Sequence, residues 1–270
     1  MSAARRVMLI TGASGGIGAD LARVAAGKGH DLALVARNRA TLDALADELA
    51  ALPGQQNPRP LVFDFDLTQA GAVGLLADAM NAAGAAPDIL VNNAGFGVLG
   101  PAAQGEIAEQ LGMIDLNIRA LTELSLLFAP KLIEAKGRLL NVASVAAFMP
   151  GPGMAVYYAS KAFVLSFSEA LSVELAPRGV TVTALCPGPV PTGFQERARF
   201  SPKMSGLFRF ALSSPEVADI AYRGMMAGKR AVVPGVVAKI MAWSAPLTPK
   251  AATLATVASL QLRRREREPS

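Results

Sequence analysis

The chain has 270 residues, of which 52% are hydrophobic and 17% are charged. This apolar content excludes a disordered chain, and the length suits one or two domains. A single cysteine, Cys186, excludes an internal disulfide, and with the single histidine, His30, it cannot build a zinc site of the usual Cys/His kind, so no metal site is predicted. Residues 263–268 supply +2 of the net charge of +5, which leaves only +3 for the rest of the chain. A nucleic-acid-binding protein needs a clustered basic face, so no nucleic-acid partner is predicted.

The first nine residues contain two arginines but lack the apolar stretch and small-residue cleavage site of a signal peptide. A glycine-rich turn follows them directly. We therefore expect a cytoplasmic protein.

Short apolar runs alternate with longer amphipathic stretches along the chain. The runs predict buried strands at residues 7–10, 32–35, 61–63, 89–91, 139–142, 180–185 and 231–233. The stretches predict helices at residues 17–27, 40–52, 70–83, 106–135, 155–175 and 215–227. This alternation predicts an α/β fold, a doubly wound parallel sheet of about seven strands with helices on both faces, in a single domain.

The last part of the chain breaks this pattern. Residues 193–212 form a strand-to-helix connection that is rich in large apolar side chains, which predicts a mobile substrate lid within a domain of residues 1–235. Six of these side chains are Phe194, Phe200, Met204, Leu207, Phe208 and Phe210. Residues 236–270 form an apolar segment that ends in a basic tail. Pro246 and Pro249 argue against a spanning helix. Packing on the domain or on a partner subunit, and attachment to a membrane surface, both stay open.

The first predicted strand runs into Thr11-Gly12-Ala13-Ser14-Gly15-Gly16-Ile17-Gly18. Glycines at 12, 16 and 18 permit a tight turn, close approach of a diphosphate to the backbone, and close packing of helix on strand. Free N–H groups and the dipole at the start of the helix favour an anion. The spacing also suits a plain strand-to-helix turn, but its place between a strand and a helix favours a nucleotide site.

The second predicted strand ends in Val35-Ala36-Arg37. A fold that binds the ribose 2′-hydroxyl of NAD has an acidic residue about 20 residues after the glycines, where this chain has Ala36 and then Arg37. An arginine suits a 2′-phosphate through its charge and its planar set of donors. The pattern predicts NADP(H) in preference to NAD(H), and the alternative is a solvated arginine at a helix start.

Tyr157 and Lys161 lie four residues apart in a predicted helix, so their side chains share one face and can meet. A neighbouring ammonium and a cationic nicotinamide ring both favour the ionised form of a tyrosine and lower its pKa. Ser144 ends a predicted strand at the carboxyl edge of the sheet, where open α/β folds bind ligands. A Tyr/Lys pair at this spacing also occurs on surfaces, and on helical geometry alone Tyr158 competes for the same role.

These motifs together resemble the short-chain dehydrogenase/reductases of the single-domain type, over about residues 5–235. Within that family the chain looks most similar to bacterial NADP-dependent ketoacyl and alcohol oxidoreductases. The resemblance implies a Rossmann-like fold and an oxidoreductase acting on CH–OH groups with NAD(P). The matching motifs, in family order, are residues 11–18, Asn92-Asn93-Ala94-Gly95, Asn117, Ser144, Tyr157, Lys161 and Pro187-Gly188.

The resemblance also implies the residues that bind the cofactor. The diphosphate and adenosine ribose would be held by Gly12, Ser14, Gly16, Ile17 and Gly18, and the 2′-phosphate by Arg37. The adenine would contact Asp66 and Leu67, and the ribose side would be lined by Asn93, Ala94 and Gly95. The nicotinamide would be fixed by Pro187, Gly188, Val190 and Thr192, together with Tyr157 and Lys161.

Four catalytic roles follow from the same resemblance. Ser144 would donate a hydrogen bond to the substrate carbonyl, and Tyr157 would be the general acid and base. Lys161 would hold the nicotinamide ribose and lower the pKa of the tyrosine, and Asn117 would support a water that links Lys161 to solvent. The predicted reaction is NADP-dependent interconversion of an apolar ketone and its secondary alcohol.

Two alternatives to this function stay open. One is a catalytically idle NADP-binding sensor or scaffold, and the other is a peripheral membrane reductase of lipid-like ketones. The expected partners are a small-molecule ketone or alcohol and further copies of the chain, as a homodimer or homotetramer.

Overall fold

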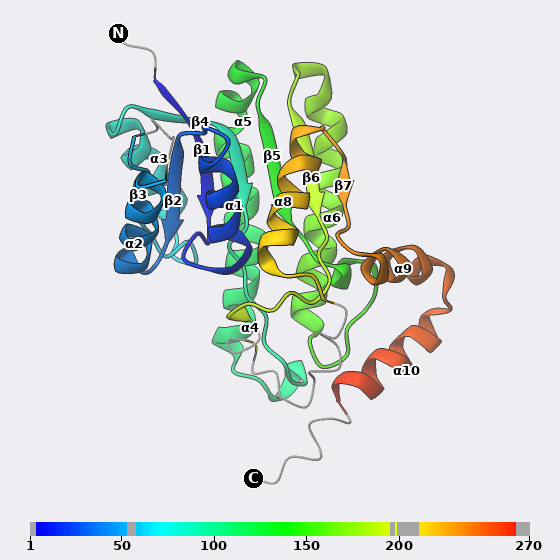
Figure 1. Ribbon diagram of the computed structural model, residues 1–270. Coiled ribbons are helices and arrows are strands. Elements are labelled where there is room, and N and C mark those ends of the chain that lie inside the picture. The colour runs from blue at the N-terminus through cyan, green and yellow to red at the C-terminus, as the bar shows by residue number, and fades with distance from the viewer. Residues whose placement is uncertain (1–3, 53–57, 195–197, 199–210, 263–270) are drawn as a thin grey trace.

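The computed structural model describes residues 4–52, 58–194, 198 and 211–262. Seven parallel strands form one sheet in the order β3-β2-β1-β4-β5-β6-β7 (Figure 1). The predicted doubly wound parallel sheet in a single domain is confirmed. The strands are β1 Arg5–Thr11, β2 Leu32–Ala36, β3 Leu61–Asp64, β4 Ala85–Asn92, β5 Arg138–Val142, β6 Thr181–Leu185 and β7 Ala231–Val232.

Helices cover both faces of the sheet, because successive side chains of each strand point to opposite faces. In β1, Met8 and Ile10 pack into one apolar cluster, and Val7 and Leu9 pack into the other. The first face carries α1 Gly16–Ala26, α2 Arg39–Ala50 and α8 Ser214–Met226. The second carries α3 Ala72–Ala82, α5 Leu121–Ala135 and α6 Ala155–Leu175.

The predicted helix over residues 106–135 is interrupted in its middle. The chain forms α4 Ile107–Ile114, then a π-helical turn Asp115–Ala120, and then α5. A π turn adds a residue to one helical turn and commonly marks a functional site. Apolar periodicity cannot reveal it, because the apolar side chains continue through the turn.

Two further helices follow β7, at the edge of the sheet where the strands end (Figure 1). They are α9 Val236–Ser244 and α10 Lys250–Gln261. Short 3-10 turns occupy Ala102–Gln104, Val145–Phe148, Ala176–Arg178 and Ala245–Leu247. Across the described ranges, none of the helices combines the length and the apolar character needed to cross a membrane.

Candidate active site

A cleft of about 1480 Å³ opens at the carboxyl edge of the sheet. The strand order reverses direction between β1 and β4, and such a switch point is where doubly wound sheets bind ligands. All of the predicted site residues line this cleft except Gly18 and Asn117. Gly18 lies behind the glycine-rich turn, since a Cβ on it would meet the carbonyl oxygen of Gly12.

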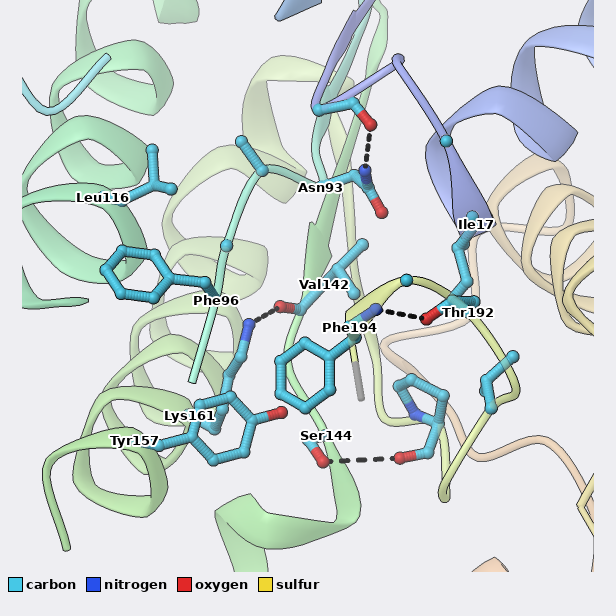
Figure 2. A pocket seen from close by; sticks show the side chains of 18 of the residues that line it. Ile17, Asn93, Phe96, Leu116, Val142, Ser144, Tyr157, Lys161, Thr192 and Phe194 are labelled. Atoms are coloured by element: carbon cyan, nitrogen blue, oxygen red, sulfur yellow. Dashed lines mark hydrogen bonds between the residues drawn. The ribbon is translucent and has the colours of Figure 1, made fainter. Parts of the chain in front are cut away.

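The Thr11 hydroxyl joins β1 to β4 at the switch point. Its oxygen accepts hydrogen bonds from the backbone N–H groups of Asn93 and Ala94, both at 3.1 Å, and it donates to the Val91 carbonyl at 3.2 Å. The Asn93 side-chain amide donates in return to the carbonyls of Thr11 and Gly12, at 3.0 and 3.1 Å (Figure 2). Thr11 was not among the predicted site residues, although its hydroxyl holds the glycine-rich turn against the loop after β4.

The glycine-rich turn leaves the first N–H groups of α1 available for an anion. The N-cap residue of α1 is Gly15, which has no side chain to cap the helix, and the first turn of α1 contains no acidic residue. Gly12 has a φ of +66°, and a Cβ on it would lie 2.8 Å from the Ala94 Cα, so this turn needs glycine. A Cβ on Gly15 would meet no atom within 4 Å, because that position faces open space. These features fit a diphosphate resting on the helix start.

Two arginines line the far end of the cleft, and the structure distinguishes them. Arg39 is held by Asp43 at 2.9 Å and by Asp64 at 3.1 Å. Arg37 is exposed and forms no ion pair with any residue in the described ranges. An arginine with uncommitted donors at this place fits a 2′-phosphate.

Tyr157 and Ser144 converge on one point of the cleft, with Lys161 close behind them (Figure 2). Tyr157 lies on the first turn of α6, and Ser144 follows β5. The Ser144 Oγ accepts from the Ala146 N–H at 3.2 Å and donates to the Pro187 carbonyl at 3.5 Å, which fixes the side chain at the cleft wall. Burial raises the pKa of Tyr157 to about 12, and the neighbouring Ser144 side chain opposes part of that rise.

This pKa differs from the sequence expectation, in which the neighbouring ammonium lowers it. The Lys161 Nζ lies 5.8 Å from the centroid of the Tyr157 ring and donates to the Val142 carbonyl at 2.8 Å. Its charge is therefore directed at a backbone oxygen, and burial dominates the pKa of the tyrosine. Burial also lowers the pKa of Lys161 to about 8, so most of the side chain stays cationic at neutral pH.

Asn117 lies on the π turn behind the cleft wall, and both polar atoms of its side chain form hydrogen bonds with neighbouring residues. Its Oδ1 accepts from the Phe96 N–H at 3.1 Å, and its Nδ2 donates to the Phe96 carbonyl at 2.9 Å and to the Ser160 Oγ at 3.0 Å. Ser160 in turn donates to the Tyr157 carbonyl at 2.7 Å. Both amide hydrogens are thus engaged. Asn117 connects the loop after β4 to the helix that carries Tyr157, and its support of a water stays a prediction.

The loop after β6, including Pro187, Gly188, Val190 and Thr192, forms another part of the cleft wall. Phe194, two residues further on, packs its ring against Tyr157 at 5.5 Å between centroids (Figure 2). It is one of the apolar residues of the predicted lid at 193–212. Most of that lid, residues 195–197 and 199–210, lies outside the described residues.

The opposite wall contains residues that the sequence analysis did not assign. Met241 of α9 and Val257, Leu260 and Gln261 of α10 line the cleft. The Gln261 Nε2 donates to the Tyr158 hydroxyl at 2.8 Å. Tyr158 is therefore directed at the C-terminal helix, whereas Tyr157 faces Ser144. In the described part of the chain, no three His, Cys, Asp or Glu side chains form a metal-binding group, and Cys186 is buried.

Comparison with known proteins identifies the class of protein. The family model for short chain dehydrogenases matches residues 6–202, so the chain belongs to the short-chain dehydrogenase family. A curated relative, the probable oxidoreductase EphD of Mycobacterium tuberculosis, is 35% identical over 192 residues. That match covers 68% of this chain but only 31% of the relative, so the chain spans about a third of that protein.

Two solved structures are similar over nearly the whole chain. A short-chain dehydrogenase from Sphingobium yanoikuyae, in complex with NADPH, is 32% identical with a TM-score of 0.78, and the match covers 98% of each chain. The bulky-bulky ketone specific alcohol dehydrogenase from Comamonas testosteroni is 27% identical with a TM-score of 0.71, and the match covers 100% of this chain and 96% of that one.

The buried Lys161 predicts a pH-dependent stability in the cofactor-free protein. Its pKa is about 8 in the folded chain, against 10.5 for an ordinary lysine side chain, so between these pH values the unfolded chain binds more protons. The free energy of unfolding contributed by this group therefore rises with pH across that window, by about 3 kcal/mol in total. Denaturant unfolding of the wild type and of Lys161→Met, from pH 7 to 10.5, measures this contribution as the difference between their free energies of unfolding.

The wild type should gain stability relative to Lys161→Met as the pH rises. Lys28→Met is the matched control, because Lys28 is exposed and its removal should leave the slope unchanged. Parallel pH profiles for the wild type and Lys161→Met would show that the ammonium is not desolvated.

Proposed function

We propose that the protein is an NADP-dependent oxidoreductase that interconverts an apolar ketone and its secondary alcohol, with Tyr157 as general acid and base. The observation that carries the proposal is the convergence of Tyr157 and Ser144 on one point of the cleft, with the buried Lys161 behind them. Their place at the switch point of the sheet, beside the uncapped start of α1, supports a nucleotide cofactor at the same point.

NADPH, when bound, supplies a hydride to the carbonyl carbon of the ketone. The Ser144 hydroxyl donates a hydrogen bond to the carbonyl oxygen and holds it toward Tyr157. The Tyr157 hydroxyl then gives its proton to that oxygen, which completes the alcohol and leaves a phenolate. Solvent then returns the proton to the phenolate, and the buried Lys161 would hold the nicotinamide ribose beside it. Tyr157 is protonated at neutral pH at its ordinary pKa as well as at the raised one, so it can supply the proton that reduction needs.

The preference for NADP(H) rests on Arg37. Its guanidinium has no ion-pair partner in the described ranges, whereas that of Arg39 is held by two aspartates. The Sphingobium yanoikuyae dehydrogenase, which is similar to this chain, is a complex with NADPH. Glycine-turn residues, Arg37, Asp66 and Thr192 would hold the cofactor along the cleft.

The proposal of an apolar substrate is based on the side chains that line the cleft. Met149, Met154, Phe194, Val257 and Leu260 line the end of the cleft around Tyr157. The similarity to a bulky-bulky ketone specific alcohol dehydrogenase supports a ketone with two large substituents. We place the dinucleotide-binding and catalytic domain at residues 1–235 and treat residues 236–270 as a C-terminal segment, of which Met241, Val257, Leu260 and Gln261 add a wall to the cleft. A cytoplasmic homodimer or homotetramer is the expected form.

The first experiment separates the two adjacent tyrosines. Tyr157→Phe should lower turnover by about 10² or more, a usual cost of removing a positioned proton donor, with little change in NADPH affinity. Tyr158→Phe is the matched control, because its hydroxyl is bonded to Gln261, and it should stay within a few-fold of the wild type. NADPH oxidation with one reducible ketone measures both. If Tyr158→Phe is the inactive variant, the catalytic assignment is wrong.

The cofactor preference is tested by binding rather than turnover. NADPH should bind at least tenfold more tightly than NADH, a difference of about 1.4 kcal/mol. Arg37→Ala should remove most of this difference, and Arg39→Ala, whose side chain is already paired, should remove little. Isothermal titration calorimetry of the wild type and of each variant with NADPH and with NADH measures these affinities. Equal affinities in the wild type would refute the role of Arg37.

The substrate class is tested with ketones of matched reactivity. Aryl and long-chain alkyl ketones should have a higher kcat/KM than small, highly polar ketones, because the cleft wall buries apolar surface. A binding-only protein would bind NADPH and reduce none of them. A preference for the polar ketones would contradict the proposed apolar pocket.

A further inference from the structure

The outward surface of α9 and of the turn after it is apolar and uncovered by any described residue. Trp243 is 82% exposed, and Leu247, Val236 and Ile240 are 79%, 72% and 61% exposed. Together with Val237 they form what we call the α9 surface. The spacing of positions 236, 240, 243 and 247 places them along one side of the segment. The opposite side of α9 is buried at Ala238 and Ala242 and reaches the cleft at Met241.

The stretch of sequence that contains the α9 surface carries charge of a single sign. Residues 224–265 contain no aspartate or glutamate, although the density of acidic residues elsewhere would place about four there. The same stretch contains Lys229, Arg230, Lys239, Lys250, Arg263, Arg264 and Arg265. Lys239 and Lys250 are exposed and lie beside the apolar side chains, in α9 itself and at the start of α10.

We propose that the α9 surface docks on an anionic lipid surface. An exposed tryptophan among aliphatic side chains suits the boundary between acyl chains and headgroups, where its ring is half buried. Basic side chains on the same segment are drawn to anionic headgroups and can extend toward them. A helix of this kind lies in the plane of the interface rather than crossing it.

A second copy of the chain fits this surface less well. A symmetric interface would bring Lys239 of one copy toward the same region of the other. Residues 224–265 offer no acidic side chain to neutralise that charge, and like charges at an interface oppose association. The docking is independent of the proposed reaction, although Met241 would place the cleft next to the lipid.

The test uses the full chain and its single tryptophan, Trp243. Vesicles of phosphatidylglycerol and phosphatidylcholine in equal parts should bind the protein and shift the tryptophan emission to shorter wavelength. Vesicles of phosphatidylcholine alone should bind more weakly, and raised salt should release the protein. Brominated lipids should quench the emission of the bound protein.

Variants then locate the docking surface. Ile240→Ser combined with Trp243→Ser should weaken co-sedimentation with the anionic vesicles at least tenfold. Leu126→Ser is the matched control on α5, where Leu126 is 55% exposed, and it should change nothing. Lys239→Gln with Lys250→Gln should weaken binding about fivefold for each charge removed, and Lys28→Gln should not. Unchanged NADPH binding and thermal midpoint show that the variants are folded.

Three outcomes would overturn the proposal. The protein could bind vesicles without any change in tryptophan emission, which would place the contact elsewhere. The α9 and Leu126 variants could weaken binding equally. The protein could ignore vesicles while Ile240→Ser and Trp243→Ser change its sedimentation coefficient, which would make the α9 surface a contact between copies of the chain.

Discussion

The hydrogen bonds between the ends of β1 and β4 are the constraint on which the site depends. Parallel strands separate at the switch point, because the helices that follow them leave toward opposite faces. The Thr11 hydroxyl and the Asn93 side-chain amide join the two strand ends through hydrogen bonds to the backbone of the opposite strand. The glycine-rich turn on one side and the loop after β4 on the other are thereby held at a fixed separation. Gly12 and Asn93, which lie at these two ends, both line the cleft.

A second set of polar groups transmits this placement to the reacting side chains. Asn117 binds the backbone of Phe96 after β4 and reaches Ser160 on α6, which binds the carbonyl of Tyr157. Lys161, one turn further along α6, is anchored to the end of β5 at Val142. The position of the proposed acid is therefore determined by two neighbouring strands. A buried ammonium has a large desolvation cost, and its bond to a carbonyl offsets part of it.

Local patterns in the sequence were sufficient to predict the sheet and most of the cleft. Strand ends that carry Gly12, Asn93, Ser144 and Pro187 must meet at one edge of a parallel sheet, so their assembly follows from chain order. Arg37 was identified because Ala36, just before it, stands where an NAD-binding fold has an acidic residue. These features depend on residues close in sequence or on the general rule of the fold.

What the sequence could not predict depends on contacts between distant residues. The bond from Gln261 to Tyr158 joins positions 103 residues apart, and no periodicity indicates it. The π turn at Asn117 is invisible because the apolar pattern continues through it. The direction of the Tyr157 pKa depends on how deeply the ring is buried and on where the Lys161 ammonium points, and neither follows from their spacing.

Transfer of hydrogen to a ketone is the most direct test of the proposed function. The protein would be incubated with propiophenone and NADPH deuterated at C4, using the 4R and 4S forms in separate reactions, and the product analysed by mass spectrometry. We predict deuterium on the carbinol carbon with one of the two cofactors and not with the other. If both cofactors bind and neither delivers deuterium to any ketone of the matched series, the cleft is a nucleotide-binding site without this chemistry, and the central claim is wrong.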